Sequence, residues 1–204
     1  MNMNPADIKR AVVAREREGI ASFVRAVADD DARAMGKALV EVGNSCVWGR
    51  ARALVRRGVG GSVQVRRAFL DIHARSGDHI RQEVDDDLLL ADAYRFLLPL
   101  YQGPGMTLFR GDTFFNRRRR TYGLCWSDDI EVARSHAEEG HSRVAEGGSV
   151  LLTVEAGAEA IICAPALHEH CFEEEREFIV DCRRLRGVRV IARYEQKPFY
   201  PAGP

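Results

Sequence analysis

The 204-residue sequence contains no apolar run that approaches the roughly 20 residues of a membrane-spanning helix. Its first residues, Met1 to Pro5, also lack the apolar region of a secretory signal. Thirty basic residues balance thirty acidic ones, so no overall charge attracts the chain to nucleic acid or membranes. These absences predict a cytoplasmic globular protein that recognises charged partners only through local clusters.

Cysteine is scarce as well, with five residues at positions 46, 125, 163, 171 and 182. The number is odd and no CxxC spacing occurs, which argues against a disulfide framework. Cys163, His168, His170 and Cys171 have the side chains of metal ligands, but their spacing matches no zinc module. We therefore expect reduced thiols and no metal site.

The first half of the chain has the apolar spacing of helices. Asn4 and Pro5 form a helix start, and the pattern continues to about residue 27. Further helices are expected near residues 32–42, over 47–57, and from Val65 to an end at Gly77. The acidic run 85–87 then precedes an apolar helix over 88–98, and residues 58–62 are expected to form a hinge or loop. No catalytic motif is visible in this half.

After Gly105 the sequence changes to short apolar runs that predict strands. They cover about 106–109, 122–127, 150–154, 160–163, 178–180 and 188–194. Asp128 and Glu131 have the spacing of a capping box, which predicts a short helix after the second strand. The sequence therefore predicts an α+β protein, with a helical region over 1–104 and a compact mixed sheet over 105–204.

A group of carboxylates at 173–177 leads directly into the apolar strand that begins at Phe178. A carboxylate such as Glu177 is costly at the start of a buried strand unless it is hydrogen-bonded or used. Residues two apart on a strand point to the same face, so we expect Glu175 and Glu177 to project together into one cleft while Arg176 points away. The alternative is an acidic loop followed by an ordinary strand.

Four consecutive arginines, Arg117 to Arg120, stand out against the neutral composition. Such a run in a loop suits an anionic partner, either a nucleic acid or an acidic protein face. The alternative is a solvated loop, which is the usual role of a run of charges.

Three separated elements of the second half together resemble the ADP-ribosyltransferases of the arginine-serine-glutamate type. They are Arg110-Gly111 at an expected strand end, Cys125-Trp126-Ser127 before a helix, and Glu175-Arg176-Glu177 before a strand. Their order and strand context are similar to the arginine, Ser-Thr-Ser and Glu-x-Glu motifs of that family. The resemblance covers residues 105–195 and implies a sheet that binds NAD as co-substrate.

The resemblance also implies a role for each matching residue. Glu177 would stabilise the oxocarbenium-like centre that forms as nicotinamide leaves, Glu175 would position the acceptor, and Arg110 would hold the NAD phosphates. The cofactor-binding residues would be Arg110, Gly111, Cys125, Trp126 and Ser127, and the acceptor-binding residues Arg117, Arg118, Arg119 and Arg120. Trp126 has the alternative of an ordinary core tryptophan.

One departure from the family pattern concerns the middle motif. Its first serine falls on Cys125 and its threonine on Trp126, and a thiol donates only a weak hydrogen bond. This predicts either slower turnover or that Ser127 or the neighbouring backbone serves instead.

The function expected from these observations is transfer of ADP-ribose from NAD to a macromolecular acceptor, protein or nucleic acid, by a bacterial or phage-associated toxin or effector. A neutralising antitoxin or immunity protein is an expected partner. Two alternatives remain open: NAD glycohydrolysis, in which water is the acceptor, and a weakly active homologue that acts as a binding module.

Overall fold

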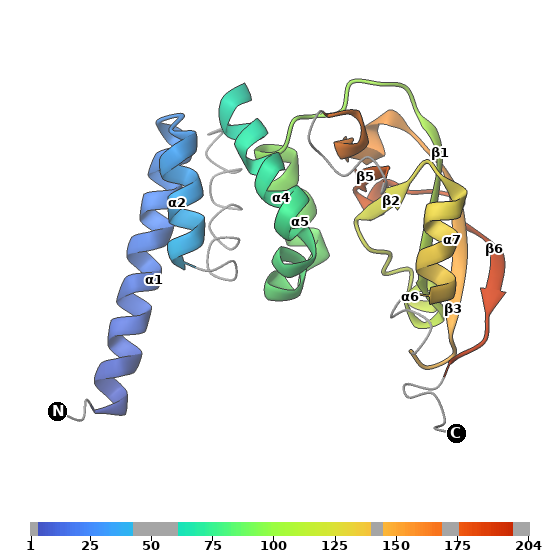
Figure 1. Ribbon diagram of the computed structural model, residues 1–204, viewed down its shortest axis with the longest axis horizontal. Coiled ribbons are helices and arrows are strands. Elements are labelled where there is room, and N and C mark those ends of the chain that lie inside the picture. Colours follow the sequence, from blue (N-terminus) through green and yellow to red (C-terminus); the bar gives the residue numbers. More distant parts are fainter. Residues whose placement is uncertain (1–3, 43–60, 140–144, 169–175, 198–204) are drawn as a thin grey trace. The chain divides into compact units, whose positions relative to one another are not determined.

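The computed structural model describes residues 4–42, 61–139, 145–168 and 176–197. The chain divides into two compact units, Met1–Pro99 and Leu100–Pro204. The first unit is helical and the second contains the sheet (Figure 1). Among the described residues, no helix combines the length and the apolar character needed to cross a membrane.

The described part of the first unit contains α1 (Pro5–Ala28), α2 (Ala32–Val42), α4 (Val63–Val84) and α5 (Asp87–Leu97). Asn4 caps α1 by accepting the Ala6 amide at 3.1 Å, and Pro5 occupies the first helical turn. Asp86 caps α5 through the amides of Leu88 and Leu89. These helix starts confirm the sequence prediction, whereas the expected helix over 47–57 lies outside the described residues.

The expected helix end at Gly77 coincides with a kink: the preceding residue, Ser76, has a φ of −143° and is not helical. The chain resumes helical backbone beyond the kink, so α4 as a whole continues to Val84. Gly77 has a packing role: a Cβ there would lie 2.8 Å from the ring of His73. His73 is buried, and its Nδ1 lies 3.2 Å from the hydroxyl of Tyr94 on α5.

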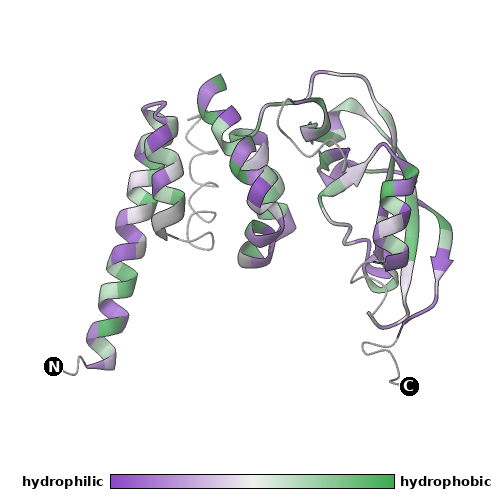
Figure 2. Cartoon of the chain, viewed as in Figure 1, coloured by the Kyte–Doolittle hydropathy of each residue, from purple (hydrophilic) through white to green (hydrophobic). Residues whose placement is uncertain are grey.

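Each helix of the first unit carries both apolar and polar residues (Figure 2). The apolar ones form its core, where many side chains are completely buried. This core includes Phe23, Val27, Met35, Val65, Phe69, Ile80, Leu90, Leu97 and Leu98.

The second unit is built on a six-stranded sheet with the order β4-β5-β2-β1-β3-β6. The strands are β1 (Met106–Thr113), β2 (Cys125–Ser127), β3 (Ser149–Ala156), β4 (Ile161–Cys163), β5 (Glu177–Val180) and β6 (Arg189–Tyr194). Every pairing is antiparallel, which corrects the expected mixed sheet. Apolar runs predict strands but do not encode their direction, which depends on how each connection crosses the sheet.

Among the described residues, α-helices and short 3₁₀ helices accompany the sheet. They are α6 (Phe114–Arg119), α7 (Ile130–Glu139), η2 (Ala158–Ala160), η3 (Pro165–Leu167) and η4 (Cys182–Arg184). The capping residue of α7 differs from the expected one: Asp129, not Asp128, accepts the Glu131 amide at 2.8 Å.

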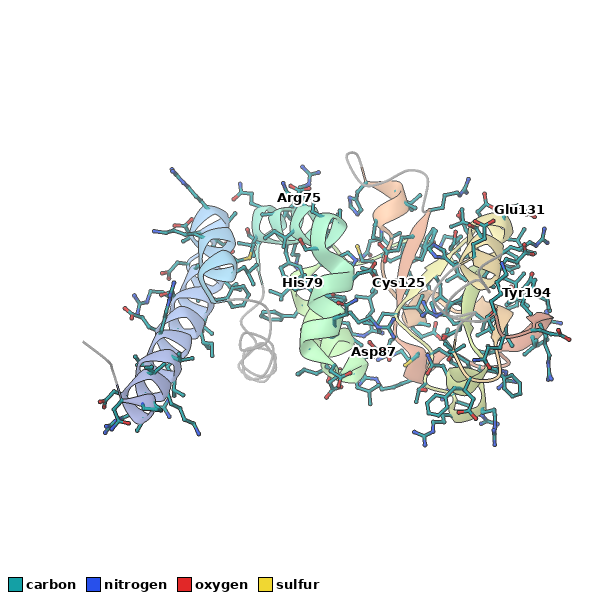
Figure 3. All side chains as sticks on the ribbon, turned by 60° about the horizontal axis from the view of Figure 1, so that its bottom comes forward. Arg75, His79, Asp87, Cys125, Glu131 and Tyr194 are labelled. Atoms are coloured by element: carbon teal, nitrogen blue, oxygen red, sulfur yellow. The ribbon has the colours of Figure 1, made fainter. Side chains whose placement is uncertain are left out.

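The two faces of the sheet are packed differently. One face forms the larger core, with Leu108, Leu152 and Phe178 among its members. On the other face α7 packs through Ala133 and Ala137 against Leu151. Burial and a hydrogen bond with Glu138 of α7 raise the pKa of Tyr194, which lies at the end of β6 (Figure 3).

Candidate functional site

Residues of all three predicted motifs lie on three adjacent strands at the centre of the sheet: Glu177 on β5, Cys125 to Ser127 on β2, and Arg110 and Gly111 on β1. Ser127 is paired with Glu177 on one side and with Phe109 on the other. Paired residues share a face, and residues two apart on a strand share it too, so Cys125 joins Ser127 and Glu177. The fold therefore brings together two motifs that are far apart in the sequence.

Arg110 connects β1 to β2 at the point where the two strands separate. Their ladder contains the single pair Phe109 and Ser127, and beyond it the Arg110 Nη1 donates to the carbonyl of Cys125. The Arg110 side chain is 13% exposed, so most of its guanidinium is covered. Arg110 lies inside β1, which extends to Thr113, and not at the strand end that the sequence predicted.

Asp112 holds the Arg110 guanidinium from the same face of β1. Its Oδ2 accepts the Arg110 Nε at 2.8 Å, while its Oδ1 accepts the Thr113 amide and the Asn116 Nδ2, both at 2.8 Å. Burial alone would raise the pKa of Asp112, but Arg110 and these hydrogen bonds together lower it below its usual value. The sequence analysis did not single out Asp112, although its spacing of two from Arg110 on a strand was the available signal.

Glu177 is the first residue of β5 and is half-buried, as expected for a carboxylate at the mouth of a strand. The residue before it breaks the expected alternation, because Arg176 has a φ of 44° in the left-handed region. The extended backbone that would direct Glu175 and Glu177 to one face is therefore absent at Arg176. Glu175 itself lies outside the described residues.

Arg176 links the start of β5 to the turn between β2 and α7. Its Nε and Nη2 donate to the two carboxylate oxygens of Asp128 at 2.6 and 2.7 Å. In the same turn, the Ser127 hydroxyl accepts the Asp129 amide at 3.1 Å. Asp128 and Arg176 thus fix the neighbours of Ser127 and Glu177, and sequence analysis assigned neither of them this role.

The other two residues of the middle motif have different environments. Cys125 is half-buried, is not part of a disulfide and contributes its backbone carbonyl to Arg110 (Figure 3). Trp126 is 2% exposed, donates its Nε1 hydrogen to the Gly123 carbonyl and belongs to the larger core. The structure does not bring Trp126 to the face that carries Ser127 and Glu177.

Gly111 lies beneath α7. A Cβ at this position would lie 2.5 Å from the Ala137 nitrogen and 2.6 Å from the Ala133 oxygen. These are backbone atoms of a packed helix, so the geometry gives Gly111 a packing role. The sequence analysis grouped it with the cofactor-binding residues.

The four arginines do not form the expected loop. Arg117, Arg118 and Arg119 end the short helix α6, and Arg120 caps it with a φ of 59°. Arg117 donates to the Tyr122 hydroxyl at 3.1 Å, and Arg119 stacks 4.5 Å above the ring of Phe115. Within the described part of the chain, none of the four arginines forms an ion pair with a carboxylate.

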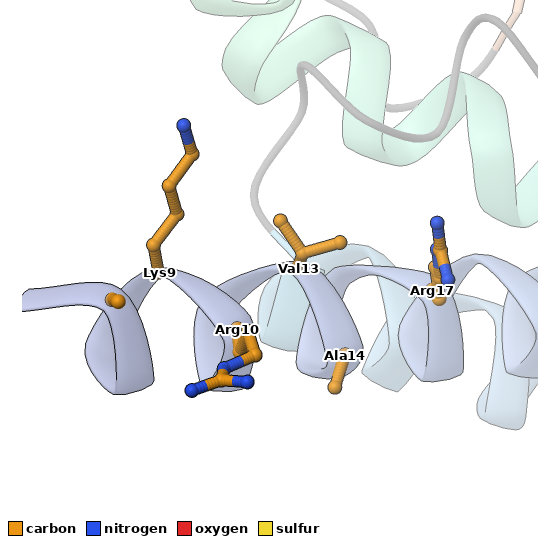
Figure 4. Close-up of a pocket in the computed structure, with 6 residues that line it drawn as sticks. Lys9, Arg10, Val13, Ala14 and Arg17 are labelled. Atoms are coloured by element: carbon orange, nitrogen blue, oxygen red, sulfur yellow. The ribbon is translucent and has the colours of Figure 1, made fainter.

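A hollow in the first unit follows the exposed side of α1 (Figure 4). It is lined by Ala6, Lys9, Arg10, Val13, Ala14 and Arg17. All of these belong to one helix, and none is a predicted site residue. A search of the described residues found no group of three or more His, Cys, Asp or Glu placed to hold a metal ion.

The candidate site thus contains Glu177, Ser127 and Cys125 on one face. Arg110 follows Phe109 and is paired with Leu152, so its side chain starts from the opposite face, at the point where β1 and β2 separate. Comparisons of the chain with protein-family models, with curated proteins and with solved structures found no match.

Proposed function

We propose that the chain transfers ADP-ribose from NAD to a macromolecular acceptor and releases nicotinamide. The observation that carries this proposal is the pairing of Ser127 with Glu177 beside the strands that Arg110 bridges. The residues that resemble the serine and glutamate of the family share one face of two adjacent strands, and the arginine lies on the next strand, where its side chain starts from the opposite face.

Glu177 is the proposed catalytic carboxylate. Departure of nicotinamide leaves positive charge on the ribose, and a carboxylate at the 2'-hydroxyl interacts more strongly with this charge than with the ground state. Glu177 is half-buried, so water screens its charge less than at an exposed position. Its interaction is therefore selective for the transition state.

Arg110 is the proposed contact for the NAD phosphates. A guanidinium has five N–H donors, and the contacts to Asp112 and the Cys125 carbonyl use Nε and Nη1. The exposed 13% of the side chain is the part that a phosphate would reach. The short Cys125 side chain beside Ser127 leaves the serine hydroxyl as the stronger hydrogen-bonding group of the motif.

The identity of the acceptor distinguishes ADP-ribose transfer to a macromolecule from NAD glycohydrolysis. Glu175 is proposed to position the nucleophile of a macromolecule, and if water reaches the same centre the reaction becomes NAD glycohydrolysis. A toxin or effector role, with an antitoxin or immunity protein as partner, belongs to this proposal as well. A binding module without turnover would show neither reaction.

Substitution of Glu177 by Gln tests the proposal. The change keeps the size of the side chain and removes its charge, so both transfer and NAD hydrolysis should fall by about 100-fold or more. The measurement is release of nicotinamide and transfer of label from NAD in a cell lysate, followed by protease or nuclease digestion to identify the acceptor. Glu155→Gln, which changes an exposed carboxylate of β3, is the matched control and should retain full activity.

Near-native turnover in the Glu177→Gln protein would exclude Glu177 as the catalytic carboxylate. If the unmodified chain consumes no NAD in any lysate, the enzymatic proposal fails and the binding-module alternative takes its place. Circular dichroism and thermal unfolding of the variant separate a catalytic loss from a loss of fold.

A further inference from the structure

The surface around α6 combines arginines with aromatic rings. We define the basic aromatic surface as Phe115, Arg118, Arg119, Arg120 and Arg193. Phe115 is 50% exposed, and the guanidinium of Arg119 lies 4.5 Å from its ring centroid. The guanidinium of Arg193 on β6 lies 5.2 Å from the ring centroid of Phe114, the neighbour of Phe115. The two arginine-aromatic pairs thus involve consecutive residues of α6.

The charge of this surface is not neutralised by described carboxylates. Asp112, which precedes α6, is buried and paired with Arg110. Glu146 is exposed in the turn whose Gly147 packs against Phe114, and Glu195 is exposed two residues after Arg193, so two negative charges lie near four positive ones. Within the described residues, no ion pair is formed by any arginine of the surface.

The surface is rigidly attached to the candidate site. Thr113 caps α6, and Asn116 donates to the same Asp112 carboxylate that holds Arg110. Arg117 donates to the Tyr122 hydroxyl, and Tyr122 packs edge-on against Trp126 of β2 at 6.2 Å between ring centroids. A ligand bound at α6 would therefore lie at a fixed position relative to β1 and β2.

We propose that the basic aromatic surface binds single-stranded nucleic acid and, if the proposed function holds, that this strand is the acceptor of ADP-ribose. Proteins that bind single strands combine a basic track for the phosphates with aromatic and guanidinium planes on which bases stack. The exposed ring of Phe115 and the guanidiniums of Arg119 and Arg193 supply such planes. An acidic protein face would use the charges but would leave the exposed aromatic ring without a partner.

Binding is tested first, without NAD, by fluorescence anisotropy of labelled single-stranded RNA and DNA of mixed sequence. The triple variant Arg118→Ser, Arg119→Ser, Arg120→Ser should make the negative slope of the logarithm of the binding constant against the logarithm of the salt concentration shallower by about 2. Each lost phosphate contact on a single strand contributes about 0.7 to this slope. Phe115→Ser should weaken binding about tenfold through lost stacking and leave the slope almost unchanged. Arg117 is retained because its contact with Tyr122 is structural.

The control variant Lys9→Ser, Arg15→Ser, Arg17→Ser removes the same charge from the exposed part of α1 and should bind like the unmodified chain. The proposal is overturned if this control loses as much affinity as the α6 triple variant. It is overturned as well if the unmodified chain binds no single strand, or if polyglutamate displaces the strand from α6 at equal charge concentration.

Labelled NAD is then added to the bound strand. The acceptor assignment is supported if the unmodified chain transfers label to the nucleic acid and the α6 triple variant does not. Label found on protein alone overturns the assignment. If nicotinamide is never released although the strand binds, the proposed function fails while the binding surface stands. The two failures are therefore distinguishable.

Discussion

Asp112 is the single residue on which the geometry of Arg110 depends most. Its two carboxylate oxygens accept hydrogen bonds from Arg110, Thr113 and Asn116, and its side chain is 3% exposed. An arginine that is 13% exposed would be poorly solvated without this partner. Asp112 therefore sets the position of the guanidinium and of the first turn of α6.

Asp112→Asn should lower the free energy of unfolding by about 3 kcal/mol at neutral pH, because it leaves a mostly buried guanidinium without its counter-charge. The pKa of Asp112 is lowered in the folded state, so the stabilisation is present above the ordinary carboxyl pKa of about 3.9 and is lost as the pH falls through the folded-state value. Urea unfolding of both proteins from neutral pH into the acid range measures this difference. A difference that stays constant into the acid range would contradict the ion-pair explanation.

Predictions for single residues agree with the structure where the conformation depends on the neighbouring residues of the sequence. The sequence predicted a carboxylate at the start of a buried strand, and Glu177 begins β5. The shared face of Glu175 and Glu177 required extended backbone at Arg176, but that residue has a φ of 44° and an ion pair with Asp128. A tertiary contact of this kind leaves no periodic signal in the sequence.

At the scale of elements, the packing of α7 against β1 depends on Gly111. Backbone atoms of Ala133 and Ala137 occupy the space into which a side chain at this position would point. Asp129 caps this helix, and its own amide is held by the Ser127 hydroxyl. The position of α7 therefore affects the turn that contains Ser127.

Gly111→Ala should destabilise the second unit by about 1–3 kcal/mol, because the added methyl group must push the α7 backbone away from β1. Thermal unfolding measures the loss. The matched control is Gly36→Ala in α2, where a Cβ meets nothing within 4 Å and a helical alanine should stabilise by about 0.5–1 kcal/mol. Unchanged stability together with a higher KM for NAD would instead support the predicted role of Gly111 in cofactor binding.

The ion pair between Asp128 and Arg176 should position the start of β5 relative to β2. Either charge reversal, Asp128→Arg or Arg176→Asp, should reduce NAD turnover by up to about fivefold, since an exposed pair contributes at most about 1 kcal/mol. The double variant should recover part of the loss, and aspartate tolerates the left-handed backbone of position 176. Arg10→Asp, which breaks an exposed pair with Asp7 on α1, is the control. Equal losses in the single and double variants would contradict a positioning role.

Element positions were predictable from caps and apolar spacing, but their ends and partners were not. Asn4 and Asp86 cap helices as their residue types suggest. Gly77 was expected to end a helix, yet it provides space for the ring of His73 within α4. A glycine is compatible both with a helix end and with close packing, and the residues that pack against it in the folded chain decide which of the two occurs. The antiparallel direction of the strands likewise depends on how the connections cross the sheet, which the sequence of each strand does not show.

At the scale of the whole molecule, the chain divides into units with their own cores. All six strands and both helices packed on them lie within Leu100–Pro204. The apolar core of the helical unit, which contains Phe69 and Leu90, is formed by residues before Pro99. The proposed catalytic residues belong to the second unit alone, so the helical unit is expected to serve recognition or regulation of the acceptor.

A fragment of residues 100–204 should therefore fold cooperatively and retain NAD hydrolysis within about fivefold of the full chain. A chain of about 100 residues is a common domain size, and every strand pairing of the sheet is made inside the fragment. Circular dichroism and urea unfolding measure its fold, and nicotinamide release measures its activity. Glu177→Gln in the same fragment controls for background hydrolysis. A fragment that remains unfolded, or a folded one without turnover although the full chain is active, would mean that the helical unit takes part in the fold or the chemistry of the sheet.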